Sequence, residues 1–229
     1  MEPQTTGLIG KLVDGMIRRS VRKAFHTVRW IPPSAPVSQP AVFVPNHHGW
    51  HDGYLMYVAL TKLGYPFLDW VTEFDAFPLF GKVGGMRFPR DDAAGRAATI
   101  RQSIRALQAG KKNLLLFAES ELHYPPELLP FGDALGLIAK KVPAVAVIPV
   151  AIRYEMAFHE RPEAFLSFGP PVEAGPRVPE RTRLAVRALL DETALRVRHR
   201  PETFLTLVEG TKDVNERWDM RNIPGRRKP

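Results

Sequence analysis

Short apolar runs alternate with longer segments of helical spacing along most of the chain. The apolar runs predict buried strands at 41–44, 67–71, 114–118, 144–153 and 165–168. Between them, apolar residues recur every three to four positions, which predicts helices at 53–62, 77–82, 92–108, 135–141 and 179–198. Strands that alternate with helices are typical of α/β proteins. We therefore expect a single α/β domain over residues 41–209, with a mixed central sheet flanked by helices.

The N-terminal segment has a different pattern. From Gly7 to Trp30 the apolar residues follow helical spacing, and arginines and lysines occupy the opposite face. We expect residues 1–31 to form a basic amphipathic helix that lies on an anionic membrane surface, with Trp30 at its end. The alternative is a helix whose apolar face packs on the domain. A Pro-rich spacer follows at 32–40, and residues 210–229 form a basic tail without an apolar period.

Composition and charge narrow the classes of function. The 229 residues include no cysteine, which excludes disulfides, thiolate zinc sites and cysteine nucleophiles. The formal net charge is +8, of which +4 lies in residues 1–31 and +3 in residues 210–229. A nearly neutral body with basic ends does not indicate nucleic-acid binding. It indicates an anionic partner at the termini, and we expect a peripheral protein on the cytoplasmic face of a membrane.

The densest cluster of reactive side chains follows the predicted strand at 41–44. It runs Asn46-His47-His48-Gly49-Trp50-His51-Asp52-Gly53, where a strand passes into a helix. In one interpretation His47 is a general base whose ring is oriented by Asp52. In a second, His47, His48, His51 and Asp52 hold a metal ion. In a third, the histidines are structural and bond to turn carbonyls.

The spacing His47-x4-Asp52 resembles the first motif of the glycerolipid acyltransferases, whose type member acylates lysophosphatidic acid. The same residues also read as His-His-x-x-x-Asp-Gly, the signature of condensation domains, in which His48 would be the base. Three further motifs favour the glycerolipid family. They are Gly84 with Arg90, Phe117 with Glu119, and the unit Val147-Ile148-Pro149-Val150. Ala118 and Ser120 replace the proline and glycine usual in the third motif.

The resemblance implies an O-acyltransferase that uses His47 and Asp52 for catalysis. It also implies substrate binding at Arg90, Glu119, Gly84 and Ser120, with no metal or cofactor. The acyl donor would be acyl-CoA or acyl carrier protein, and the acceptor a lysophospholipid or a related lipid. Glu121 beside the third motif leaves the acceptor open among lysophosphatidic acid and other lipid, sugar or pigment hydroxyls. The alternatives are a metal-dependent hydrolase and a non-catalytic lipid-binding protein.

Overall fold

The computed structural model describes residues 4, 5 and 7–218 of the chain. Its α-helices are α1 (Gly7–Ala24), α2 (Asp52–Leu63), α3 (Ala93–Gln108), α4 (Asp133–Lys141), α5 (Val178–His199) and α6 (Val214–Arg217). Short 3₁₀ helices span η1 (Phe74–Ala76), η2 (Pro78–Val83) and η3 (Pro201–Thr203). The strands are β1 (Thr27–Ile31), β2 (Ala41–Pro45), β3 (Phe67–Val71), β4 (Gly85–Arg87), β5 (Asn113–Leu115), β6 (Ala146–Glu155), β7 (Glu163–Phe168) and β8 (Leu205–Glu209).

The eight strands form one mixed sheet in the order β4-β3-β5-β2-β6-β7-β1-β8. The first five strands of this order are parallel to their neighbours. Strand β7 then pairs antiparallel with β6, and β8 pairs antiparallel with β1. Because the carboxyl ends of the five parallel strands meet at one edge, the loops that follow them are brought together there.

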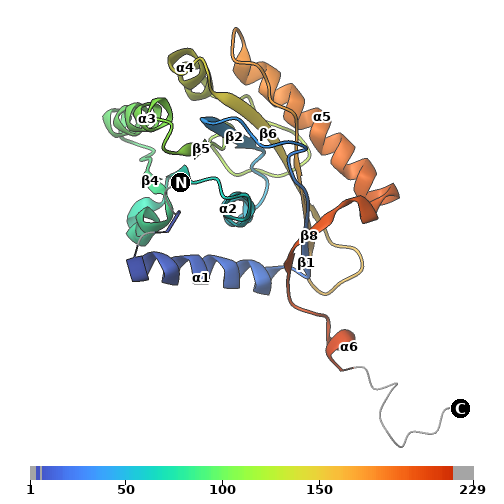
Figure 1. Ribbon diagram of the computed structural model, residues 1–229. Helices are drawn as coiled ribbons and strands as arrows, with labels where there is room; N and C mark the ends of the chain where they lie inside the picture. The colour runs from blue at the N-terminus through green and yellow to red at the C-terminus, as the bar shows by residue number, and fades with distance from the viewer. Residues whose placement is uncertain (1–3, 6, 219–229) are drawn as a thin grey trace, which may run out of the picture.

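Helices cover both faces of the sheet (Figure 1). Helices α1 and α2 lie on one face, where Ile17, Leu55 and Phe43 belong to one hydrophobic core. Helices α3, α4 and α5 lie on the other face, where Leu107, Ile138 and Val186 belong to a second core. Since the central strands are buried on both faces, they read as continuous apolar runs in the sequence. The expected α/β domain with a mixed sheet is confirmed.

The N-terminal segment differs from the predicted helix over 1–31. Helix α1 ends at Ala24, and residues 27–31 form β1, which lies inside the sheet between β7 and β8. Trp30 is therefore buried against Phe168 and does not end an exposed helix. The segment Thr-Val-Arg-Trp-Ile is rich in β-branched and aromatic residues, which favour a strand, and its apolar spacing fits either element. This segment is thus part of the domain.

The C-terminal boundary also differs from the prediction. Strand β8 is an edge strand of the sheet and pairs with β1. Residues beyond 209 still contact the domain, because the N–H of Thr211 donates to Phe25 O at 3.0 Å. Asp213 accepts hydrogen bonds from His159 and from the N–H of Glu160. The rest of the predicted basic tail, residues 219–229, lies outside the described residues. Among the described helices, none is long and apolar enough to cross a membrane.

Candidate active site

The loop after β2 is fixed to the strands on both sides of it. Asn46 is fully buried, and its side chain exchanges two hydrogen bonds with the backbone of Ile152 on β6. The N–H of His47 donates to Oε1 of Glu119, in the loop after β5, at 2.7 Å. Anchored to β6 on one side and to the β5 loop on the other, the loop holds His47 at the carboxyl edge of the parallel strands.

His47 and Asp52 form the predicted pair. Nδ1 of His47 lies 3.1 Å from Oδ2 of Asp52, and the carboxylate is fully buried while about a quarter of the His47 side chain is exposed. Oδ2 of Asp52 also accepts the N–H of Gly49 at 2.8 Å. Because the carboxylate accepts from Nδ1–H, the other ring nitrogen, Nε2, carries the lone pair. The imidazole is therefore held in the tautomer that a general base requires.

Tyr154 completes the environment of Asp52. It lies on β6 and donates its hydroxyl hydrogen to Oδ1 of Asp52, while its ring stacks on Phe25. Burial and the neighbouring carboxylate raise the pKa of the Tyr154 hydroxyl, so it stays protonated and donates at neutral pH. Sequence reasoning missed this residue because it lies 102 positions from Asp52. Its position at the end of the fourth motif's strand was the only signal that could have found it.

The other two loop histidines form no hydrogen bond with Asp52. The ring of His48 lies between the Asn46 side chain and the carbonyl of Glu127, with Nε2 3.0 Å from that oxygen. His51 packs edge-on against Phe25. Burial lowers the pKa of both imidazoles. His48 is therefore not placed as the base of a condensation domain.

The geometry also gives no support to the predicted metal alternative. Within the described residues, two groups of side chains lie close enough to share an ion. They are His26, His159, Asp213 and Glu216, and His48, Glu119 and His123. Neither group contains His47, His51 or Asp52, so the four residues of the proposed metal site do not converge.

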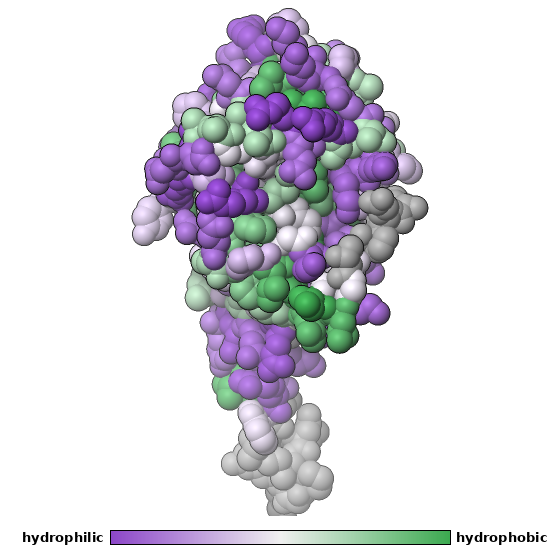
Figure 2. Space-filling view, turned by 90° about the vertical axis from the view of Figure 1, so that its left-hand side faces the viewer, coloured by the Kyte–Doolittle hydropathy of each residue, from purple (hydrophilic) through white to green (hydrophobic). Residues whose placement is uncertain are grey.

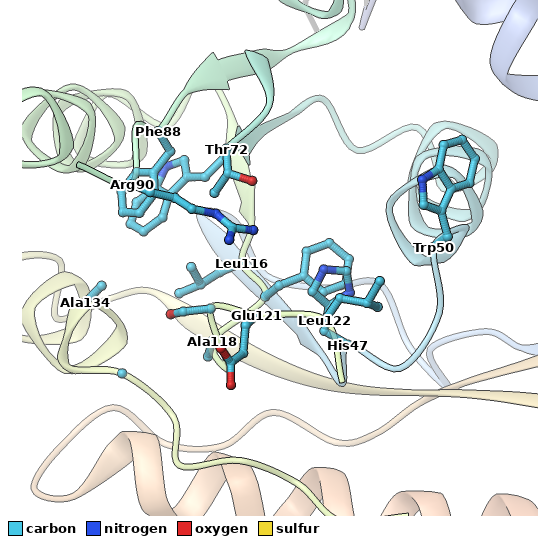
Figure 3. Close-up of a pocket in the computed structure, with 14 residues that line it drawn as sticks. His47, Trp50, Thr72, Phe88, Arg90, Leu116, Ala118, Glu121, Leu122 and Ala134 are labelled. Carbon is cyan, nitrogen blue, oxygen red and sulfur yellow. The ribbon is translucent and has the colours of Figure 1, made fainter. Parts of the chain in front are cut away.

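A pocket of about 290 Å³ opens in front of His47. Figure 3 shows Arg90 directed into it from the side opposite Trp50. Ser120 and Glu121 also line the pocket, whereas Leu116, Phe88 and Trp70 supply apolar wall. Two of the predicted substrate-binding residues, Arg90 and Ser120, are therefore brought together with His47.

Glu119 and Gly84 are placed differently. Glu119 is buried behind the His47 loop, and its carboxylate is occupied by the N–H groups of His47 and Leu129 and by Nε2 of His123, each at 2.7 Å. Gly84 ends η2 with φ +101°, a conformation that favours glycine, and a Cβ there would lie 2.4 Å from the carbonyl of Phe67. These contacts indicate supporting roles, outside the lining of the pocket.

A second, apolar groove of about 220 Å³ meets the first pocket at His47. The two share His47, Trp50, Trp70, Thr72 and Phe117. The groove runs between α1, α2 and β3, and its further lining is mostly aromatic and aliphatic. That lining includes Ile17, Tyr54, Tyr57, Phe67, Phe80 and Val83, together with the carboxyl of Asp69. The imidazole of His47 therefore stands where a polar pocket and an apolar groove join.

Comparison with known proteins assigns the chain to a class. The family model described as Acyltransferase matches residues 26–153, more than half of the chain, and the protein belongs to this acyltransferase family. Among solved structures it resembles the 1-acyl-sn-glycerophosphate (LPA) acyltransferase PlsC from Thermotoga maritima, with a TM-score of 0.58 and 21% sequence identity. The match covers 83% of this chain and 80% of that one, which shows a common fold. No curated protein matches the chain.

Proposed function

We propose that the protein transfers a fatty acyl group from an acyl thioester, of coenzyme A or acyl carrier protein, to the hydroxyl of a lysophospholipid or related lipid. The observation that carries this proposal is the His47–Asp52 pair, which stands where a pocket containing Arg90 meets an apolar groove. A base, an anion-binding side chain and room for an aliphatic chain are what such a transfer requires.

The reaction needs one proton transfer to the base and one from it. Nε2 of His47 takes the proton of the acceptor hydroxyl as its oxygen attacks the thioester carbonyl, and Asp52 stabilises the imidazolium that forms. The tetrahedral intermediate then expels the thiolate, which takes the proton back from the imidazolium. The ester and a free thiol are the products, and no covalent acyl-enzyme is formed.

The two cavities suit the two substrates. Arg90 is exposed in the first pocket, and its planar guanidinium can bind a phosphate or carboxylate of the acceptor through two parallel hydrogen bonds. The apolar groove accommodates the acyl chain, whose methylene groups are stabilised by leaving water. In this arrangement the acceptor hydroxyl and the thioester carbonyl meet beside His47.

Thiol release tests the proposal directly. The purified full chain is given acyl-CoA or acyl carrier protein thioester and a lysolipid, and the freed thiol is measured with a thiol reagent, to which the cysteine-free protein adds no background. We expect His47→Ala and Asp52→Asn to lose about 10²- to 10⁴-fold in rate. His51→Asn is the matched control, because His51 lies in the same loop but its ring packs on Phe25 and forms no hydrogen bond with Asp52. Equal rates in wild type and His47→Ala would refute the proposal.

We further propose that the outer surface of α1 lies on an anionic membrane. Val13, Ile17 and Val21 are buried against the domain, so the helix packs on it as the alternative interpretation expected. A second apolar row stays exposed on the same helix, beside exposed basic residues. The row consists of Leu8, Ile9, Leu12 and Met16, and the basic residues are Lys11, Arg19, Arg22 and Lys23. Figure 2 shows hydrophobic residues gathered low on the face of the molecule where α1 begins.

Vesicle binding tests this membrane proposal without disturbing the core. Deleting residues 1–31 would remove β1 from the sheet, so point substitutions are preferable. We expect the double variant Leu8→Ser, Leu12→Ser to bind vesicles containing phosphatidylglycerol at least tenfold more weakly, because each exposed leucine contributes roughly 1.5 to 3 kcal/mol when buried. The double variant Leu184→Ser, Leu195→Ser on α5 carries two comparably exposed leucines and serves as control. Unchanged co-sedimentation of the α1 variant would contradict the proposal.

A further inference from the structure

Asp69 places a carboxyl in the wall of the apolar groove. Side chains alternate along β3, so Leu68 packs toward the core beneath α3 while Phe67, Asp69 and Val71 line the groove on the α2 side. Trp70 packs against the same core as Leu68 and also lines both cavities where they meet. Phe67 is part of the buried core on that face. The strand therefore carries an acidic group at a position where its periodicity calls for an apolar one.

The carboxyl of Asp69 has no side-chain partner in the part of the chain that the structure describes. Its backbone N–H donates to Gly84 O at 3.0 Å, but its carboxylate forms no ion pair or side-chain hydrogen bond with a described residue. Burial raises the pKa of Asp69 to about 7, and the backbone amide of Trp70 offsets part of that rise. The carboxyl is only partly buried and has one backbone donor, so an apolar chain that covers it removes its water without replacing the lost hydrogen bonds. A ligand that supplies a further hydrogen-bond donor at this point is therefore favoured.

The position of Gly53 shows which part of the groove the Asp69 carboxyl faces. It lies across from Asp69, and a Cβ added at Gly53 would stand 4.0 Å from Oδ2 of Asp69. Because Gly53 directly follows Asp52, the carboxyl faces the stretch of groove beside the reacting atoms. The absence of a side chain at Gly53 leaves room there for a substituent on a bound chain.

We propose that Asp69 makes the groove selective for an acyl chain that carries a hydroxyl group near its thioester end. The inference rests on the proposed function, which puts the acyl chain in this groove. The chain's hydroxyl donates a hydrogen bond to the Asp69 carboxyl, while its remaining methylene groups contact Tyr54, Phe67 and Phe80. An unsubstituted chain would cover the carboxyl and leave it with the backbone amide of Trp70 as its donor. Asp69 makes and breaks no bond, so it determines specificity and takes no chemical step.

Matched thioesters provide the kinetic test. The rate constant kcat/KM is measured for three thioesters. They are tetradecanoyl-CoA, 3-hydroxytetradecanoyl-CoA and a tetradecanoyl-CoA hydroxylated at the methyl end of its acyl chain. We expect wild type to prefer the 3-hydroxy chain about tenfold over the other two, since a hydrogen bond to a carboxylate gives discrimination of this order. Asp69→Leu should prefer the unsubstituted chain, whereas Asp69→Asn, which retains an acceptor oxygen, should keep part of the original preference. Asp191→Leu, on the exposed surface of α5, is the control.

A binding measurement separates this inference from the proposed function. Trp50 and Trp70 line the groove, so quenching of their fluorescence reports binding of the same thioesters to the inactive His47→Ala protein. Tighter binding of the 3-hydroxy chain in that protein, lost on adding Asp69→Leu, supports the inference whether or not transfer is observed. Equal discrimination with and without Asp69 overturns it. A preference that appears only for hydroxylated lysolipid acceptors also overturns it, because it would put the acceptor in the groove.

Discussion

The hydroxyl of Tyr154 donates a hydrogen bond to Oδ1 of Asp52, across 102 residues of sequence. Oδ2 of the same carboxylate accepts from Nδ1 of His47 and from the N–H of Gly49. Both oxygens of a fully buried carboxylate are therefore satisfied, and its orientation toward His47 is fixed from three sides. His47 is thus positioned by β6 as much as by its own loop.

Replacing Tyr154 by Phe should slow transfer while leaving acceptor binding unchanged. The ring and its stacking on Phe25 are retained, but Oδ1 of Asp52 loses its donor. We expect kcat to fall about tenfold, the effect of one lost hydrogen bond. More negative charge stays on Asp52, which favours the imidazolium, so the acid limb of the kcat/KM profile should move to higher pH. An unchanged pH profile with lowered stability alone would show that Tyr154 is only structural.

Gly49→Ala should disturb the loop through the same tyrosine. A Cβ at Gly49 would lie 2.4 to 2.6 Å from the ring and hydroxyl of Tyr154, closer than atoms can approach. We expect a loss of about 1 to 3 kcal/mol in the free energy of unfolding and at least a tenfold loss of activity. Gly15→Ala on α1 is the matched control, because its Cβ would meet nothing within 4 Å. The control should gain up to about 1 kcal/mol from helix propensity, measured by urea unfolding.

Glu119→Gln distinguishes a supporting residue from a head-group ligand. The carboxylate accepts two backbone N–H groups and Nε2 of His123, and an amide nitrogen in its place would face a donor. We expect a loss of about 2 kcal/mol in the free energy of unfolding, together with a lower kcat. A raised KM for the acceptor at unchanged kcat and stability would instead support the head-group role that the family resemblance implied. Glu202→Gln, at an exposed position, controls for the charge change.

Asp69 should lower the free energy of unfolding as the pH rises, the reverse of what a salt-bridged carboxylate does. Because burial raises its pKa to about 7 in the folded state, the folded protein holds this proton more tightly than the unfolded chain does. Its contribution to stability is complete below the unfolded pKa, near 4, and is lost as the pH rises through 7. We expect Asp69→Asn to be about 2 kcal/mol more stable than wild type at pH 8, with little difference at pH 4. Urea unfolding at both pH values measures this, and a constant difference would contradict it.

Local patterns in the chain were enough to predict most of the architecture. Apolar runs and helical spacing predicted strands β2, β3, β5, β6 and β7 and helices α2, α3, α4 and α5, with shifts of a few residues at their ends. Three strands were not predicted. Strand β4 has three residues, β1 has apolar spacing that also fits a helix, and β8 has an exposed edge. In each of these, partner strands decide the conformation, and partners are not visible in a local window.

Local spacing was enough to predict contact between His47 and Asp52, because the two residues lie five positions apart in a short loop that leads into a helix. It also determined the α/β class, since strand and helix periodicities are local properties. Packing of distant segments was needed to bring Tyr154 to Asp52, to place Glu119 behind the loop and to turn Asp69 toward a groove. Those relationships depend on which strands are neighbours and on their register, which arise from packing of the whole sheet.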